Sequence, residues 1–180
     1  GQRTKARGFG PGPVYVNGNI GTTIGGGICK VATTMFNVAV QADLQIVERH
    51  PHSMLVPYVP PGRDATILWS HKDLRFRNNK DTPIVIWSGV YGQTLFIALY
   101  GQYYPPLVEW HYEELGRNKT WVIKRQNPNL PTGEVRTMEG YDGVSGRTWI
   151  QIYYPDQTMQ KRDFGVDYYR PMPGLIEYGP

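Results

Sequence analysis

The segment Gly25-Gly26-Gly27-Ile28-Cys29 combines the residue types that thiol chemistry needs. Three glycines allow backbone conformations that a side chain would forbid, and they let a ligand approach the chain closely. They place Cys29 in the first turn of a predicted helix, where unpaired amides and the helix dipole stabilise a thiolate. The same amides, with those of Gly26 and Gly27, are able to hold the oxyanion of an acyl-transfer intermediate. The alternative interpretation is a tight corner in which Cys29 only fills the core.

A thiolate that transfers acyl groups needs an acid–base partner, and the sequence contains four histidines. His50 and His52 are neighbours in the string ERHPHS, and an extended chain would place both on one face, although the proline between them leaves that geometry open. A pair of imidazoles also suits zinc, but no carboxylate stands near at a familiar ligand spacing. His71 and His111 lie in polar, loop-like surroundings, and we assign them no role.

Arg63 and Asp64 follow the turn Pro60-Pro61-Gly62 and provide two further charged groups. Asp64 is a candidate to orient a histidine, as the third member of a triad does. Arg63 is a candidate to grip a substrate carboxylate in a forked pair. An internal ion pair that closes the turn is an equally good interpretation. The triple glycine does not resemble a phosphate loop, because the lysine–serine pattern of a P-loop is absent.

One helix and several strands must position these residues. Apolar residues recur at three- and four-residue intervals from Ile28 onward, which predicts a helix over residues 28–43. Asn17-Gly18, after a short apolar run, predicts a tight turn. Strands are predicted over 44–50, 55–59, 66–69 and 74–77, and as a hairpin over 84–90 and 94–100.

The C-terminal part of the sequence has many turn glycines and few Leu or Ile residues. Strands are predicted there over 121–125, 147–154 and 163–170. The string GQYYPP marks a boundary, so we expect a first domain over 1–101, a linker over 102–116 and an all-β module over 117–180. The expected fold class is α+β: mostly antiparallel strands with one main helix, followed by a thin, elongated β module.

The composition excludes several classes of protein. A single cysteine among 180 residues excludes an intramolecular disulfide framework and a cysteine-rich metal site. The net charge is +4, but the 19 basic residues are scattered, which argues against a nucleic-acid surface. The longest apolar run, Leu95 to Tyr100, is far shorter than the ~20 residues of a membrane span. We expect neither a cofactor nor a metal.

The motifs of the first hundred residues resemble the VanW family. Its signature is similar to GGGIC at 25–29, VATTMFN at 31–37, IVERHPHS at 46–53, YVPPGRDA at 58–65 and FRNN at 76–79, and the resemblance runs from about residue 1 to 101. A looser resemblance links the C-terminal part to the five-glycine module that follows VanW domains in Gram-positive surface proteins. It is carried by LPTGE at 130–134, by Glu139-Gly140 with Gly143, and by the closing Tyr178-Gly179. Such modules bind cell-wall glycan or act as spacers.

The resemblance implies an extracytoplasmic, wall-associated protein that modifies peptidoglycan as a cysteine L,D-transpeptidase. Cys29 would attack the carbonyl of the third stem residue and expel the terminal D-alanine, and an amine of a neighbouring stem would resolve the thioester into a 3–3 cross-link. The family's His-Ser step corresponds to His52, so we rank it above His50 as the base, with Asp64 as its partner. The residues expected around the oxyanion and the substrate are Gly26, Gly27, Thr33, His50 and Arg63.

Two residues depart from the family pattern, and three other functions stay open. Lys30 and Ala32 stand where the family has Gln and Ser; Lys30 would lower the thiol pKa further, or would signal a different acceptor or a loss of activity. The other functions are an L,D-carboxypeptidase, a non-catalytic wall-binding scaffold rich in aromatic residues, and a metal-dependent peptidase that uses the histidine pair. The expected partners are stem peptides and glycan strands, with no nucleic acid and with a membrane only through an upstream anchor. The same resemblance suggests a link to antibiotic resistance.

Overall fold

The computed structural model describes residues 1–16 and 19–180. The chain starts with a short 3-10 helix, η1 (Lys5–Arg7), and an antiparallel pair, β1 (Pro11–Val16) and β2 (Asn19–Ile24). The turn predicted at Asn17-Gly18 lies outside the described residues. Within the described part of the chain, no helix is long and apolar enough to cross a membrane.

Helix α1 (Ile28–Gln41) is the one α-helix among the described residues, as the apolar spacing predicts. Its buried face carries Ala32, Phe36 and Val40, which recur every fourth residue. The helix ends two residues before the predicted limit of 43. Asp43 has a φ of 52°, a left-handed conformation that no α-helix contains, and this residue turns the chain toward the next strand.

Two antiparallel pairs complete the N-terminal half: β3 (Gln45–Glu48) with β4 (Arg75–Arg77), and the hairpin β5 (Val85–Tyr91) with β6 (Thr94–Tyr100). The hairpin confirms its prediction. The strands predicted over 55–59 and 66–69 are wrong, since the first segment is irregular and the second forms only an isolated bridge, Leu68 to Lys72. A proline inside the first of these segments removes an amide that a ladder would need.

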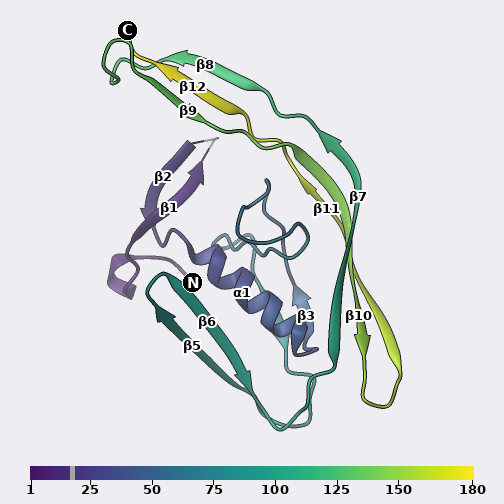
Figure 1. Ribbon diagram of the computed structural model, residues 1–180. Helices are drawn as coiled ribbons and strands as arrows, with labels where there is room; N and C mark the ends of the chain where they lie inside the picture. The colour runs from purple at the N-terminus through teal and green to yellow at the C-terminus, as the bar shows by residue number, and fades with distance from the viewer. Residues whose placement is uncertain (17–18) are drawn as a thin grey trace.

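Two three-stranded sheets form the C-terminal half. The first is antiparallel, in the order β11-β10-β7, and consists of β7 (Leu107–Asn118), β10 (Gly143–Tyr153) and β11 (Met159–Tyr169). In the second, β12 (Gly174–Tyr178) lies between β8 (Val122–Gln126), to which it is parallel, and β9 (Val135–Met138). Figure 1 shows the two sheets as one long curved ribbon, with α1 beside the first and the chain end on the second. The elongated β module thus has the expected shape.

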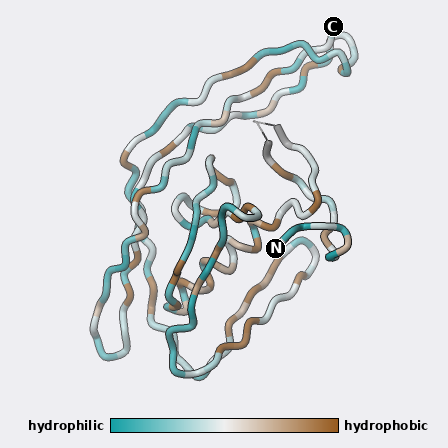
Figure 2. The backbone as a smooth tube through the Cα atoms, turned by 180° about the vertical axis from the view of Figure 1, so that it is seen from behind, coloured by the Kyte–Doolittle hydropathy of each residue, from teal (hydrophilic) through white to brown (hydrophobic). Residues whose placement is uncertain are grey.

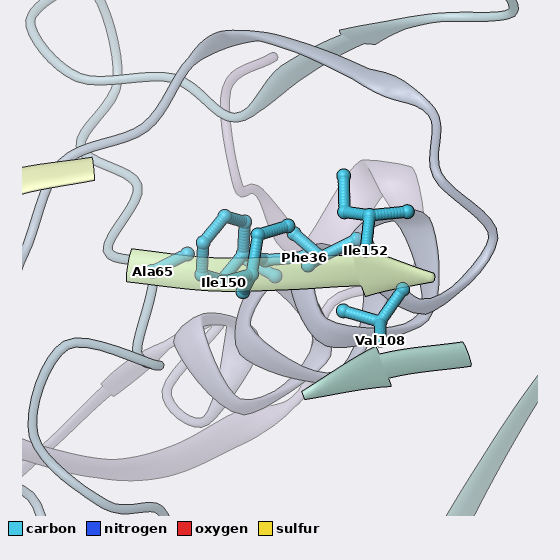
Figure 3. Packing of buried hydrophobic residues seen from close by; sticks show 7 residues of the cluster. Phe36, Ala65, Val108, Ile150 and Ile152 are labelled. Carbon is cyan, nitrogen blue, oxygen red and sulfur yellow. The ribbon is translucent and has the colours of Figure 1, made fainter. Parts of the chain in front are cut away.

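One hydrophobic core joins the two halves of the chain (Figure 3). Phe36 of α1 is fully buried and packs edge-on against Trp110 of β7 and Phe164 of β11. The cluster is completed by Ala32, Val40, Ala65, Val108, Ile150 and Ile152. Residues 107–116 of the expected linker therefore belong to β7, because Val108 and Trp110 alternate toward the helix as strand residues do. The domain limits themselves stay a prediction.

The hairpin β5–β6 exposes apolar side chains. Figure 2 shows hydrophobic stretches along both strands, and Val85, Val90 and Phe96 are 64%, 67% and 47% exposed. Strand β6 packs against α1, but none of the hairpin's residues belongs to the core cluster.

Candidate active site

The three glycines form the corner that delivers Cys29. Gly25 and Gly27 have positive φ values of 75° and 85°, which favour glycine, and Gly27 is the N-cap of α1. Gly26 packs directly on the backbone of β1, where an added Cβ would lie 2.2 Å from the carbonyl carbon of Gly12. Nothing lies within 4 Å of a Cβ on Gly27. One side of the corner is thus closed by β1 and the other is open beside the start of the helix.

Cys29 is the second residue of α1, and its thiol is partly buried among polar atoms. Its Sγ lies 3.4 Å from Thr66 Oγ1 and 3.8 Å from the carbonyl oxygen of Ile67. Burial would raise the pKa of the thiol, but hydrogen bonding to His52, Thr66 and Ile67 outweighs it and lowers the pKa from 9.0 to about 7. Cys29 is therefore poised to ionise near neutral pH, unlike a thiol that only fills a core.

His52 joins the thiol to Asp64. Its Nδ1 lies 2.6 Å from Asp64 Oδ2, and its backbone amide donates to the same oxygen at 2.7 Å. This pair fixes the tautomer, because Nδ1–H donates to the carboxylate and leaves Nε2 for the thiol and for the Tyr58 hydroxyl at 3.4 Å. Burial would lower the pKa of His52, but hydrogen bonds with Asp64 and Cys29 raise it to about 9.

Asp64 is 1% exposed and is held by more than the histidine. Its Oδ1 accepts hydrogen bonds from Arg49 Nη2 at 2.9 Å and from the Tyr169 hydroxyl at 2.5 Å. Arg49 also donates from Nη1 to Asp167 Oδ2 at 2.5 Å. Burial would raise the pKa of Asp64, but hydrogen bonds from His52 and Tyr169 and the charge of Arg49 hold it below its usual range. Asp64 is therefore an ionised, oriented partner for the imidazole.

The structure brings together Cys29, His52 and Asp64, but it ties other predicted residues elsewhere. His50 Nε2 pairs with Glu48 Oε1 at 2.9 Å, so the two neighbouring histidines have different carboxylate partners. Among the described residues, no three His, Cys, Asp or Glu side chains are grouped as metal ligands would be.

Thr33 and Arg63 have partners inside the protein. The Thr33 hydroxyl is buried and bridges the amide and the carbonyl of Ala65, at 3.0 and 3.2 Å. Arg63 Nε donates to Asn37 Oδ1 at 3.0 Å, and its guanidinium stacks 4.9 Å over the Trp110 ring. These contacts fasten the loop before Asp64 to α1 and β7. The alternative of an ion pair within the turn is not observed, since Asp64 pairs with Arg49.

A cavity of about 450 Å³ lies next to residues that flank Cys29, although Cys29 itself does not line it. It shares Ile28 and Ile67 with the surroundings of Cys29, and Leu68 and Trp69 add apolar walls. Charged side chains of both signs also line it: Arg3, Glu48, Lys72 and Asp73. Lys30 does not line this cavity; its Nζ lies 5.3 Å over the Tyr58 ring.

Sequence reasoning missed four residues of the site. Thr66 contacts the thiol, and Arg49, Asp167 and Tyr169 surround Asp64. Arg49 stands inside the histidine string, where a charged neighbour was a usable signal. The residues of β11 are more than a hundred positions from Asp64, and no local pattern links them to it.

Comparisons with known proteins place the N-terminal half in a family. The uncharacterized protein YoaR of Bacillus subtilis is 47% identical over 100 residues, which cover 56% of this chain and 33% of that protein. The vancomycin B-type resistance protein VanW of Enterococcus faecalis is 25% identical over 138 residues, 69% of this chain and 50% of that protein. The chain thus spans half or less of the length of these curated relatives.

Two solved G5 domains are similar to part of the chain. The IgA1 protease G5 domain covers 44% of this chain and 98% of its own, with 20% identity and a TM-score of 0.27. The G5 domain of HP0197 covers 41% and 96%, with 14% identity and a TM-score of 0.21. We draw no residue correspondences from structures this distant. The family described as "VanW like protein" matches residues 1–100, more than half of the sequence, and the chain belongs to the VanW family.

Proposed function

We propose that this protein is a cysteine acyltransferase that acts on peptidoglycan stem peptides, an L,D-transpeptidase that forms 3–3 cross-links. One observation carries the proposal: a partly buried thiol at the start of a helix interacts with an imidazole whose other nitrogen lies 2.6 Å from a buried carboxylate. Nucleophile, base and orienting acid in this order are what thiol-based acyl transfer requires.

The charge states support this chemistry. Because the pKa of His52 is about 9, the imidazole keeps its proton near neutral pH, while the thiol, with a pKa of about 7, is about half ionised there. The reactive form of the pair is then a thiolate beside an imidazolium. The thiolate is the reactive nucleophile, and the imidazolium is the acid that a leaving amine needs.

The first half-reaction follows from this pair. The thiolate of Cys29 attacks the carbonyl carbon between the third stem residue and the terminal D-alanine. The amides at the start of α1, on the open side of Gly27, are suited to receive the negative charge that develops on the carbonyl oxygen. His52 gives its proton to the D-alanine nitrogen as the C–N bond breaks, which leaves a thioester on Cys29 and a neutral imidazole.

The second half-reaction reverses these roles. The neutral His52 takes a proton from the amine of a second stem peptide, and the amine attacks the thioester carbonyl. The new amide forms, the thiolate leaves, and the thiolate–imidazolium pair is restored. Water in place of the amine gives the L,D-carboxypeptidase reaction on the same machinery. The cavity next to Ile28 and Ile67 offers apolar walls and charges of both signs to a stem peptide, which carries apolar methyl groups as well as charged carboxylates and amines.

Family membership supports a role in the cell wall, because one relative is named a vancomycin B-type resistance protein. We therefore propose an extracytoplasmic, wall-associated location. The C-terminal sheets resemble five-glycine modules in sequence and are proposed to bind wall glycan.

Incubation with a disaccharide tetrapeptide tests the proposal. Mass spectrometry should show loss of D-alanine, formation of a dimer and a covalent adduct on Cys29. The Cys29→Ala variant should show none of these, while Ser53→Ala, a change of similar size at an exposed neighbour of His52, should keep all three. Turnover that survives Cys29→Ala would falsify the proposal. Wall binding with no adduct and no turnover in the parent protein would indicate a scaffold instead.

A further inference from the structure

The Oδ1 oxygen of Asp64 accepts a hydrogen bond from a residue on a strand that lies far along the chain. Tyr169, on β11, donates its hydroxyl to Asp64 Oδ1 at 2.5 Å and accepts the amide of Gly62 at 2.8 Å. Asp167, two residues earlier on the same strand face, pairs with Arg49, which in turn contacts Asp64 through its side chain and through the carbonyl at 2.6 Å. We propose that Asp167 and Tyr169 are positioning residues for the Cys29–His52–Asp64 site, so that strand β11 is a working part of that site.

The charges in this network alternate. The imidazolium of His52 faces the carboxylate of Asp64, which faces the guanidinium of Arg49, which faces the carboxylate of Asp167. Without Asp167, the full positive charge of Arg49 would act on Asp64 alone and would offset the charge that stabilises the imidazolium. Asp167 therefore keeps Asp64 available to His52.

Burial makes the alternation effective. The side chains of Arg49, Asp64 and Asp167 are 7%, 1% and 8% exposed, and Tyr169 is 1% exposed. Water screens such charges poorly, and a buried carboxylate left without its partners is costly. Burial and the neighbouring carboxylates raise the pKa of Tyr169, so its hydroxyl stays a proton donor.

Strand β11 lies outside the part of the chain that matches the VanW family. The family match ends at residue 100, so Asp167 and Tyr169 lie outside it. They reach Asp64 because β10 and β11 pack on α1 through the shared core of Phe36, Ile150 and Phe164. A module that served only as a spacer between the first domain and the membrane would not need a buried acid beside Arg49 and a buried hydroxyl beside Asp64.

Asp167→Asn tests the electrostatic part, since it removes one charge and keeps the size of the side chain. Two measurements apply to the full chain: the His52 titration by NMR of its ring proton, and the pH profile of Cys29 alkylation by iodoacetamide. The His52 pKa is expected to fall from about 9 by about one unit, and the midpoint of thiol alkylation is expected to rise. The other groups that face His52, Cys29 and the Tyr58 hydroxyl, are unchanged.

Asp163→Asn is the matched control. Asp163 lies on the same strand and pairs with an arginine, Arg147, at 2.6 Å, but on the exposed face and away from Asp64. Its loss is expected to leave both titrations where they are in the parent protein. A general weakening of β11 would affect both variants, whereas a positioning role affects only Asp167→Asn.

Tyr169→Phe tests the positional part with no change of charge, and it keeps the inference testable if Asp167→Asn does not fold. The variant is expected to slow Cys29 alkylation at neutral pH by roughly two- to tenfold, the range that one lost hydrogen bond corresponds to. Tyr168→Phe is its control, because that side chain is 52% exposed and its hydroxyl accepts from Asn118.

The outcomes separate this inference, which rests on the proposed function, from that function itself. Neither measurement needs a peptidoglycan substrate. An ordinary thiol pKa in the parent protein would overturn the proposed function and the inference together. A lowered thiol pKa that stays unchanged in folded Asp167→Asn and Tyr169→Phe would overturn the inference alone.

Discussion

Replacing His52 with alanine should move the ionisation of Cys29 toward its ordinary value. The hydrogen bond with His52 is the largest influence that lowers the thiol pKa from 9.0 to about 7 against the effect of burial. Hydrogen bonds with Thr66 and the Ile67 backbone and the charge of His52 contribute less. At pH 7, a thiol with a pKa of about 7 is about half ionised, whereas one with a pKa of 9.0 is about 1% ionised, so the thiolate population falls ~50-fold.

The observable change in rate is smaller than the change in population. A thiolate that is two pKa units more basic is also roughly tenfold more reactive, which offsets part of the loss. Alkylation of His52→Ala by iodoacetamide is therefore expected to be about fivefold slower than that of the parent protein at neutral pH. In strongly alkaline buffer the order reverses, because both thiols are then ionised. The two rate profiles must cross.

His50→Ala provides the control for this experiment. It makes the same change two residues away, at a histidine that pairs with Glu48. Its alkylation profile is expected to coincide with that of the parent protein. A midpoint near 7 that persists in His52→Ala would refute the reasoning, since the low pKa would then come from the hydrogen bonds with Thr66 and the Ile67 backbone.

Two further predictions follow from the same site. The rate of thioester formation should rise with pH around 7, as the thiol of Cys29 ionises, and should fall again around 9, as His52 loses the proton that the leaving amine needs. Stopped-flow measurement of acylation across this pH range checks both changes. A rate that only rises with pH would contradict the paired roles of Cys29 and His52. Gly26→Ala should lower the free energy of unfolding, measured by chemical denaturation, by more than Gly27→Ala does. The added Cβ at position 26 would lie 2.2 Å from the backbone of β1. The added Cβ at position 27 would lie in open space, so that variant costs only the strain of a positive φ, about 1 kcal/mol. Equal losses of stability would show that Gly26 does not pack as described.

Several parts of the fold and site were predictable because the signals are local. The apolar spacing after Ile28 needs only one face of a helix, and the hairpin at residues 84–100 needs only two strand patterns around a glycine turn. Cys29, His52 and Asp64 stand in short strings of recognisable residue types. Their roles as nucleophile, base and orienting acid stay predictions, which the observed distances support.

Other parts depend on contacts that no local pattern contains. Residues 102–116 were expected to form a linker, because the string GQYYPP at 101–106 marks a boundary, but Val108 and Trp110 pack toward the helix as part of β7. The segment predicted as a strand over 55–59 is irregular, and Pro57 within it has no amide to donate to a neighbouring strand. The adjacency of Arg63 and Asp64 left an ion pair within the turn as one interpretation, whereas in the structure Asp64 pairs with Arg49.

The amino-acid sequence by itself determined which groups are available for chemistry: one thiol, a histidine pair and an acid after a proline-rich turn, carried by a helix and short strands. Only the tertiary structure decided which histidine contacts the acid and the thiol, and that Asp167 and Tyr169 complete the surroundings of Asp64. The physical reason is that hydrogen bonds and charge pairs act over a few ångströms in space, whatever the separation along the chain. The packing of β11 on α1, rather than any motif, brings those partners within reach.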